Sequence, residues 1–180
     1  MIAAFTGVSR ESRQGFTILE LMTVILIIAI MAVLLFPALS SVRSRTEKTQ
    51  CMANLRALYG GAEAYLQQNG KWPQIDTRLI RKGNEYDKAW IAALEPFNIG
   101  RKNWICPTFQ KSAGDPDYTK DASARVDYIA TPFDDKTITP HRWPTQPWFV
   151  ERPSPHGNGN LIIFTDGHIA ELNDYAKPKK

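Results

Sequence analysis

The residues best suited to chemistry gather near the C-terminal end of the chain. His156, Asp166 and His168 could bind zinc, because imidazole and carboxylate groups are both zinc ligands. No cysteine or second carboxylate joins them at ligand spacing, so we expect no metal among these three residues. We expect instead that His156 packs against, or hydrogen-bonds to, a hairpin that Asp166 begins. Neither these residues nor His141 with its nearby serines form a nucleophile motif, and we expect no enzymatic activity.

An acidic run, GDPDYTKD at residues 114–121, is the second candidate for ligand binding. Oxygen ligands at alternate positions, here Asp115, Asp117 and Asp121, can hold calcium. The EF-hand pattern fails, however, because Thr119 and Lys120 stand where Asp or Asn and then Gly are required. The pattern therefore favours a solvated turn, with calcium as the alternative.

The two cysteines, Cys51 and Cys106, are too few for a disulfide-dense scaffold. They could form a disulfide in an oxidising compartment, or they could remain as two buried thiols. A disulfide over so long a loop would contribute about 4 kcal/mol in the chain-entropy description. The sequence leaves both states open, because it does not give the distance between the two residues.

The composition limits the class of protein that could carry these residues. A chain of 180 residues allows one domain, with room for an appendage. The 22% of charged residues and 11% of aromatic residues exclude a disordered chain. A net charge of +4 is too small to indicate nucleic acid as the main partner.

The apolar residues are concentrated in one uncharged segment, LMTVILIIAIMAVLLFPAL at residues 21–39. As a helix this segment would be about 29 Å long, which matches the hydrocarbon thickness of a bilayer. It is apolar on every face, so a membrane span is the expected role. A secretory signal peptide cleaved near Ser40 is the alternative, and the length of the run and Glu20 at its edge disfavour it.

An amphipathic helix should follow the span, because apolar residues recur there at intervals of three or four. We expect it to end near Gln68, where Asn69 and Gly70 supply a stop signal. Gly60 and Gly61 should weaken it by about 1 kcal/mol each and allow a bend. The residues predicted to line its buried face are Cys51, Leu55, Leu58, Ala62 and Tyr65.

The last part of the chain carries all five Trp and eleven of the twelve Pro, which indicates short elements packed around aromatic anchors. We predict a short helix over residues 87–97, with Trp90, Ile91 and Leu94 on one face. Residues 126–131 should form a strand. Residues 160–165 and 168–172 should form a hairpin whose two turn residues, Asp166 and Gly167, both adopt positive φ. The expected fold class is α+β, with the apolar face of a small antiparallel sheet covering the amphipathic helix.

The sequence RQGFTILEL at residues 13–21 closely resembles the prepilin cleavage and methylation motif of type IV pilins and type II secretion pseudopilins. The resemblance implies that a prepilin peptidase cuts after Gly15 and methylates Phe16, although Gln14 replaces the usual Lys or Arg. It also implies that Glu20 pairs with the N-terminal amine of Phe16 on a neighbouring subunit. A Pro at the distance of Pro37 is similarly typical of the pilin helix, and we expect a kink there.

The resemblance implies a pilin-like fold with four segments. These are a leader over residues 1–15 that is removed, a transmembrane and polymerisation helix over 16–39, an amphipathic helix half over 40–69, and a globular periplasmic α+β domain over 70–180. Major pseudopilins hold calcium in their C-terminal region, which is a further reason to keep Asp115, Asp117 and Asp121 as weak calcium candidates.

A second resemblance lies in His156, nine intervening residues, and then Asp166 and Gly167. This spacing is similar to the H-x9-D-G signature of a pilin-like group common in planctomycetes, verrucomicrobia and relatives. The Cys51-x-x-Asn54-Leu55 and Cys106-Pro107 sequences also resemble that group. We expect a structural role for the three signature residues.

Together the resemblances imply a single-pass subunit of the inner membrane, with its C-terminal domain periplasmic, that joins a type II secretion pseudopilus or a type IV pilus-like filament. The implied partners are other pilin or pseudopilin subunits, the prepilin peptidase, the membrane and the secretion or pilus assembly machinery. The alternative is a processed, membrane-tethered binding module that does not polymerise and that binds through Trp- and Pro-rich loops such as residues 141–144.

Overall fold

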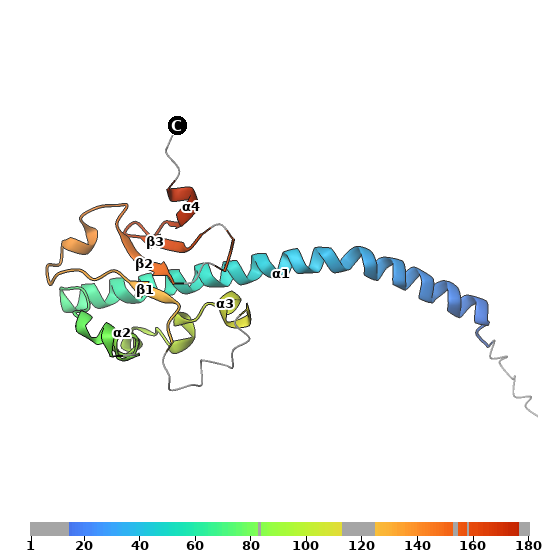
Figure 1. Cartoon of the computed structure of the whole chain (residues 1–180), viewed down its shortest axis with the longest axis horizontal. Helices are drawn as coiled ribbons and strands as arrows, with labels where there is room; N and C mark the ends of the chain where they lie inside the picture. The colour runs from blue at the N-terminus through green and yellow to red at the C-terminus, as the bar shows by residue number, and fades with distance from the viewer. Residues whose placement is uncertain (1–14, 83, 113–124, 153–154, 158, 177–180) are drawn as a thin grey trace, which may run out of the picture. The chain divides into compact units, whose positions relative to one another are not determined.

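The computed structural model describes residues 15–82, 84–112, 125–152, 155–157 and 159–176, with only the backbone described for residues 36–41. The chain divides into two compact units, Met1–Val42 and Arg43–Lys180. The long helix α1 (Ile18–Asn69) contributes residues to both units (Figure 1). Each unit is described by itself.

The first unit is the apolar part of α1. The segment Ile18–Leu35 is long and apolar enough to cross a membrane, and none of it is buried. The helix continues through Pro37, so this residue does not end it. The predicted kink at Pro37 stays a prediction.

The second unit begins with the amphipathic part of α1. Cys51, Leu55, Leu58 and Ala62 are fully buried, as the periodicity predicts. Tyr65 is only partly buried, and the neighbouring Leu66 is buried in its place. The helix ends at Asn69, and Gly70 follows with φ +67° and donates its N–H to the carbonyl of Leu66 at 2.8 Å. Glycine suits this position because a left-handed residue ends the helix there.

Short elements joined by turns follow α1, as the composition predicts. Of the residues expected on one face of the short helix α2, Trp90 and Leu94 are buried and Ile91 is partly buried. Trp72, Trp104 and Trp148 join Trp90 in one aromatic core, with ring centroids 4.9–6.5 Å apart between neighbours. These elements are η1 (Thr77–Arg81), α2 (Glu85–Leu94), η2 (Glu95–Phe97), η3 (Arg101–Trp104), α3 (Pro107–Ser112) and η4 (Thr139–His141).

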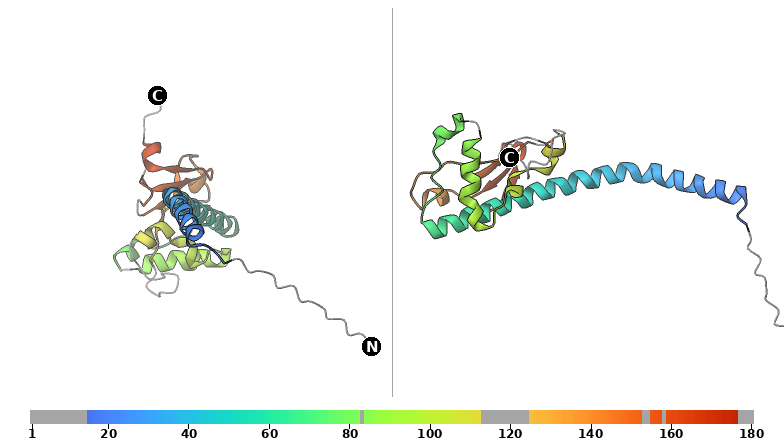
Figure 2. Two further views of the ribbon diagram at one scale, coloured as in Figure 1. Left: turned by 90° about the vertical axis from the view of Figure 1, so that its right-hand side faces the viewer. Right: turned by 90° about the horizontal axis from the view of Figure 1, so that it is seen from below.

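Four antiparallel strands form one sheet in the order β1-β2-β3-β4. Its apolar residues pack with the buried face of α1 in a single core, which confirms the α+β fold. Figures 1 and 2 show β3 on one side of α1 and α2 on the other. The strands are β1 (Tyr128–Ala130), β2 (Pro147–Glu151), β3 (Leu161–Phe164) and β4 (Ile169–Glu171), and α4 (Leu172–Tyr175) follows them.

The predicted hairpin is confirmed, but its predicted turn is wrong. Gly167 has φ +75°, whereas Asp166 has no positive φ. The Phe164 carbonyl accepts the N–H of Gly167, and the Phe164 N–H donates to the carbonyl of His168. The turn thus has three residues, of which only the last needs the left-handed region, and this type of hairpin loop commonly places glycine there. Asp166 instead accepts the N–H of His168 with its carboxylate at 2.9 Å.

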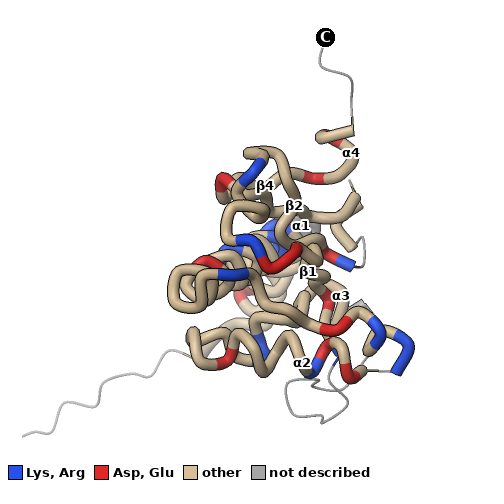
Figure 3. The backbone as a smooth tube through the Cα atoms, turned by 90° about the vertical axis from the view of Figure 1, so that its left-hand side faces the viewer, with Lys and Arg blue, Asp and Glu red and all other residues tan. Residues whose placement is uncertain are grey.

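Lys and Arg residues alternate with Asp and Glu residues along the backbone of the second unit (Figure 3). Ion pairs join several of them across the unit, including Lys48 with Glu171 and Lys111 with Glu47. This distribution is typical of a solvated surface rather than of a basic nucleic-acid interface.

Candidate functional site

The residues of the predicted cleavage site precede the first helical turn. Gly15 and Phe16 lie before Ile18, where α1 begins. Among the described residues, chain neighbours aside, none has a heavy atom within 4 Å of the position that a Cβ on Gly15 would take. Phe16 is 82% exposed. A peptide bond in an open, non-helical segment is accessible to a protease. Arg10, Arg13 and Gln14 lie outside the described residues.

Thr17 and Glu20 form a reciprocal cap at the start of α1. The Thr17 hydroxyl accepts the N–H of Glu20 at 3.2 Å, and the Glu20 carboxylate accepts the N–H of Thr17 at 3.1 Å. The same carboxylate accepts the Thr17 hydroxyl proton at 3.0 Å. This is a capping box, which satisfies backbone donors that the first helical turn leaves unpaired. The T-x-x-E spacing of residues 17–20 is the sequence signal for this cap.

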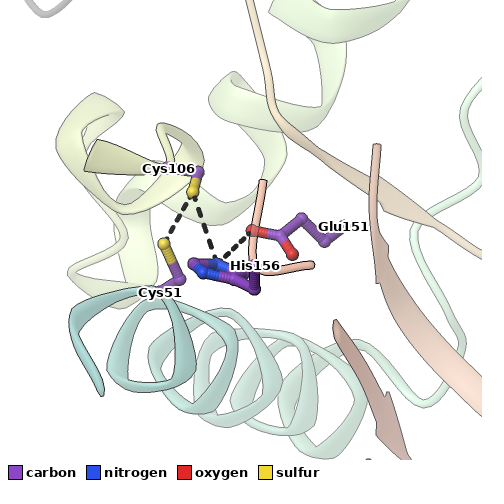
Figure 4. A group of neighbouring side chains, drawn as sticks. All are labelled: Cys51, Cys106, Glu151 and His156. Carbon is purple, nitrogen blue, oxygen red and sulfur yellow. Dashed lines mark hydrogen bonds and ion pairs between the residues drawn. The ribbon is translucent and has the colours of Figure 1, made fainter. Parts of the chain in front are cut away.

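A second group of polar side chains converges inside the second unit: Cys51, Cys106, Glu151 and His156. Their potential ligand atoms all lie within 4.8 Å of one another. Figure 4 shows that they come from different segments, with Cys51 on α1 and Glu151 at the end of β2. Cys106 directly precedes α3, and His156 lies in the segment between β2 and β3. No pair among them is closer than five residues in the sequence, so only the fold brings them together.

The contacts within this group are short. The two Sγ atoms are 2.6 Å apart, and the Cys106 Sγ lies 3.9 Å from His156 Nε2. His156 Nε2 lies 3.3 Å from the Glu151 carboxylate. Both cysteines and Glu151 are completely buried, and the His156 side chain is only 2% exposed. The group is therefore closed to solvent.

Burial and mutual contact shift the pKa values in this group. Burial, together with the neighbouring Cys106, raises the pKa of Glu151 to about 8. The hydrogen bond between the thiols lowers the pKa of Cys51 and raises that of Cys106, so the Cys51 thiol ionises first. A carboxyl and two thiols that share one dry space cannot all be ionised without a cation beside them.

One expectation from the sequence is corrected here. The argument that no cysteine or further carboxylate joins a histidine of this region is wrong, because the fold supplies two cysteines and Glu151. His156 pairs with Glu151 and lies beside Cys106, and its expected contact with the hairpin stays a prediction. His168 instead stacks on Phe164, with ring centroids 5.6 Å apart.

The structure brings Cys51 and Cys106 together as two free, buried thiols, and a disulfide between them stays a prediction. The weak calcium candidates Asp115, Asp117 and Asp121 lie outside the described residues. Sequence reasoning missed Glu151. Its signal is a carboxylate two residues after Phe149 on β2, and therefore on the same face of the strand, which the core covers.

The N-terminal part of the chain is similar to known proteins. Residues 10–36 match the prokaryotic N-terminal methylation motif. The chain is 31% identical to the type II secretion system core protein G of Klebsiella michiganensis over 70 residues, which are 39% of this chain and 49% of that protein. It is 32% identical to the core protein G of Escherichia coli over 69 residues, which are 38% of this chain and 48% of that protein.

The type IV major pilin protein PilA of Myxococcus xanthus is 28% identical over 76 residues, which are 41% of this chain and 34% of the pilin. The chain thus spans about half the length, or less, of the curated relatives it matches. No solved structure matches it. The N-terminal part of the chain thus combines a methylation motif with an apolar helix that nothing covers, and it is similar to both pseudopilins and type IV pilins.

Proposed function

We propose that the chain is a structural subunit that is cut after Gly15, methylated on the new amine of Phe16, and assembled through α1 into a filament. The filament would be a type II secretion pseudopilus or a type IV pilus-like fibre that serves protein secretion. One observation carries the proposal. An uncovered apolar helix, Ile18–Leu35, starts two residues after Phe16 and contains a single ionisable side chain, Glu20. The proposed role is structural, and no catalytic residue is assigned.

An apolar surface of this size needs a cover in water. Lipid tails would cover it before assembly, and the same segments of neighbouring subunits would cover it within a filament. We place the subunit in the inner membrane as a single-pass protein with residues 70–180 on the periplasmic side. The leader 1–15, the helix halves 16–39 and 40–69, and this domain are the proposed divisions.

Glu20 would set the register between subunits. An ionised carboxylate in the hydrocarbon region costs about 2.5–3.5 kcal/mol or more unless it has a partner. The described residues give Glu20 hydrogen bonds from Thr17 but no cationic partner. Removal of the leader creates a cation, the α-ammonium group of Phe16. In the proposed filament this amine pairs with Glu20 of the adjacent subunit, which offsets the desolvation cost.

The proposal is tested first on the mature protein. Mass spectrometry of the chain isolated from membranes should find an N-methylated Phe16 at its N-terminus. An N-terminus at Met1, or one beyond Ser40, would contradict the processing step. The Glu20→Ala variant should be processed normally but should not enter filaments, which cross-linking between subunits in the membrane would measure. Normal incorporation of this variant would contradict the proposed assembly.

A membrane-tethered binding module that is processed but does not polymerise is the second candidate. The observation in its favour is Trp143, which is 58% exposed in the second unit with the Arg142 guanidinium 5.4 Å from its ring centroid. Exposed tryptophan and arginine are common anchors of protein interfaces. If this candidate holds, Trp143→Ala should abolish protein secretion, while Glu20→Ala should leave secretion intact. The filament proposal expects the reverse.

A further inference from the structure

The proposed filament role makes no use of the four buried side chains that meet between α1, α3 and the sheet. We propose that Cys51, Cys106, His156 and Glu151 bind one zinc ion in a closed structural site. This inference does not depend on the filament role, because all four residues belong to the second unit.

The donor set is one that zinc prefers. Two thiolates, an imidazole and a carboxylate make four ligands, which is the number of a tetrahedral structural zinc site. Zinc takes such ligands at about 2.0–2.3 Å, which places neighbouring donor atoms about 3.3–3.8 Å apart in a tetrahedron. His156 Nε2 lies 3.3 Å from the Glu151 carboxylate and 3.9 Å from the Cys106 Sγ, close to this spacing. The two Sγ atoms, 2.6 Å apart, would have to separate by about 1 Å, and all the potential ligand atoms lie within 4.8 Å of one another.

The surroundings of the four residues fix the donor atoms in place. One oxygen of the Glu151 carboxylate accepts the backbone N–H of Leu161 at 3.2 Å, which turns the other oxygen toward His156. Asp127 accepts the backbone N–H of Cys106 at 2.8 Å and so holds the segment that carries this cysteine. The Thr108 hydroxyl lies 4.0 Å from the Cys51 Sγ. Outer contacts of this kind orient the ligands of a metal site.

The position of Glu151 is a further reason to expect a cation. This residue is completely buried on the core face of β2, a position that an apolar residue would ordinarily occupy. Among the described residues its only side-chain partner that can carry a positive charge is His156. In this dry space the carboxyl and the two thiols are neutral while they keep their protons, and a divalent cation would take the place of those protons and offset most of the negative charge.

A disulfide between Cys51 and Cys106 is the competing state, because sulfurs joined to each other are poor zinc ligands. The disulfide would use two of the four side chains and would leave the convergence of Glu151 and His156 on the sulfurs unexplained. The zinc site uses all four. It would join α1, the segment before α3, the end of β2 and the segment before β3 in one cross-link.

The test uses the full chain, isolated from membranes in detergent. In one half of the preparation a thiol-blocking reagent is added at lysis, and the other half is left untreated. Elemental analysis of the untreated half should find one zinc per chain. After a chelator removes the zinc, added Co²⁺ should bind and give the sulfur-to-cobalt charge-transfer absorption of thiolate ligation. A Cys51–Cys106 disulfide in the half whose thiols were blocked at lysis would overturn the proposal. A reduced chain that binds neither zinc nor Co²⁺ would also overturn it.

Two variants and a control test the other ligands. Glu151→Gln and His156→Asn keep the shape of the side chains and should weaken zinc binding by more than the roughly 10–100-fold that loss of an outer partner costs. His168→Asn is the matched control, since this histidine stacks on Phe164 and lies outside the group, and it should bind zinc like the unmodified chain. Unchanged zinc affinity in both ligand variants would overturn the four-ligand site.

Discussion

At the scale of single residues, Glu20 has two properties that a substitution by alanine removes together. Its carboxylate caps the first turn of α1 by accepting hydrogen bonds from Thr17. It is also the ionisable group of an otherwise apolar segment. A cap acts on the chain that carries it, whereas a charge in the hydrocarbon region needs a partner from elsewhere. Loss of filament entry in Glu20→Ala would therefore leave open which of the two properties matters.

Two variants separate the cap from the charge. Thr17→Ala removes the hydroxyl side of the cap, which should cost about 1 kcal/mol at the helix start, and should leave filament entry intact. Glu20→Gln keeps an amide oxygen for capping but removes the negative charge, and it should abolish filament entry. Inter-subunit cross-linking measures entry, and hydrogen exchange at the first-turn amides measures the cap. If Thr17→Ala also abolished entry, the cap and not the charge would be the assembly determinant.

Asp87 on α2 carries a pH dependence of the second unit. Burial raises its pKa above the usual value, although Arg152 at 3.2 Å opposes the shift. In the window between the ordinary and the raised pKa, the folded chain therefore holds a proton that the unfolded chain has lost. The contribution of Asp87 to the free energy of unfolding is largest below the ordinary pKa and falls as the pH rises through this window.

The Asp87→Asn variant should remove that dependence. Relative to the unmodified chain, its free energy of unfolding should rise as the pH is raised from about 4 to about 7. Asp76→Asn is the control with the opposite sign. Hydrogen bonds from Arg78 lower the pKa of Asp76, so its contribution is lost only as the pH falls below the ordinary value of about 4, and this variant should show no pH-dependent difference between about 4 and about 7. Urea unfolding at a series of pH values measures both. A pH-independent difference for Asp87→Asn would contradict the raised pKa.

Residue type alone drew attention to three of the four residues of the proposed zinc site. Cys51, Cys106 and His156 stood out in the sequence because thiols and imidazoles are uncommon and reactive. Glu151 did not, because the chain has many carboxylates and only the strand register and the cover of α1 make this one buried. The convergence of the four joins segments up to 105 residues apart, from Cys51 to His156, and no local pattern encodes such a contact.

At the scale of elements, the sequence predicted the features that depend on nearby residues. It did not predict the features that depend on contacts between distant residues. Periodicity identified α2 and the buried face of α1, and Asn69-Gly70 identified the end of α1, because each signal lies within a few residues. The hairpin was found for the same reason, but its three-residue turn was missed, because Asp-Gly fits both turn types. The role of Gly61 was also missed, because it depends on Ile99, 38 residues away.

The two adjacent glycines of α1 should respond oppositely to alanine. A Cβ on Gly61 would lie 2.3 Å from Ile99 Cγ1, so Gly61→Ala should lower the free energy of unfolding by about 1–3 kcal/mol through overpacking. A Cβ on Gly60 would meet nothing within 4 Å, so Gly60→Ala should raise it by up to about 1 kcal/mol through helix propensity. Denaturant unfolding of the full chain in detergent measures both. Pairing Gly61→Ala with Ile99→Ala should recover part of the loss, and no recovery would contradict the close approach.

At the scale of the whole molecule, the two units differ in what stabilises them. Every member of the buried core lies in Arg43–Lys180, from Cys51 on α1 to Ile163 on β3. The segment Ile18–Leu35 contributes nothing to this core and has no cover of its own. The apolar segment of the first unit thus needs a cover from outside the chain, whereas the second unit can be stabilised by its own packing.

A chain that begins at Arg43 should therefore fold in water without detergent and should stay monomeric. It keeps the whole hydrophobic core, the four-tryptophan cluster, and the ion pair between Lys48 and Glu171. Near-ultraviolet circular dichroism should show its packed tryptophans, and gel filtration should show its size. A chain that begins at Leu55 is the control, because it loses both Lys48 and the buried Cys51, and it should be markedly less stable. Aggregation of the longer fragment would mean that the apolar half of α1 also supports the fold of the second unit. Equal stability of the two fragments would contradict the contribution assigned to Lys48 and Cys51.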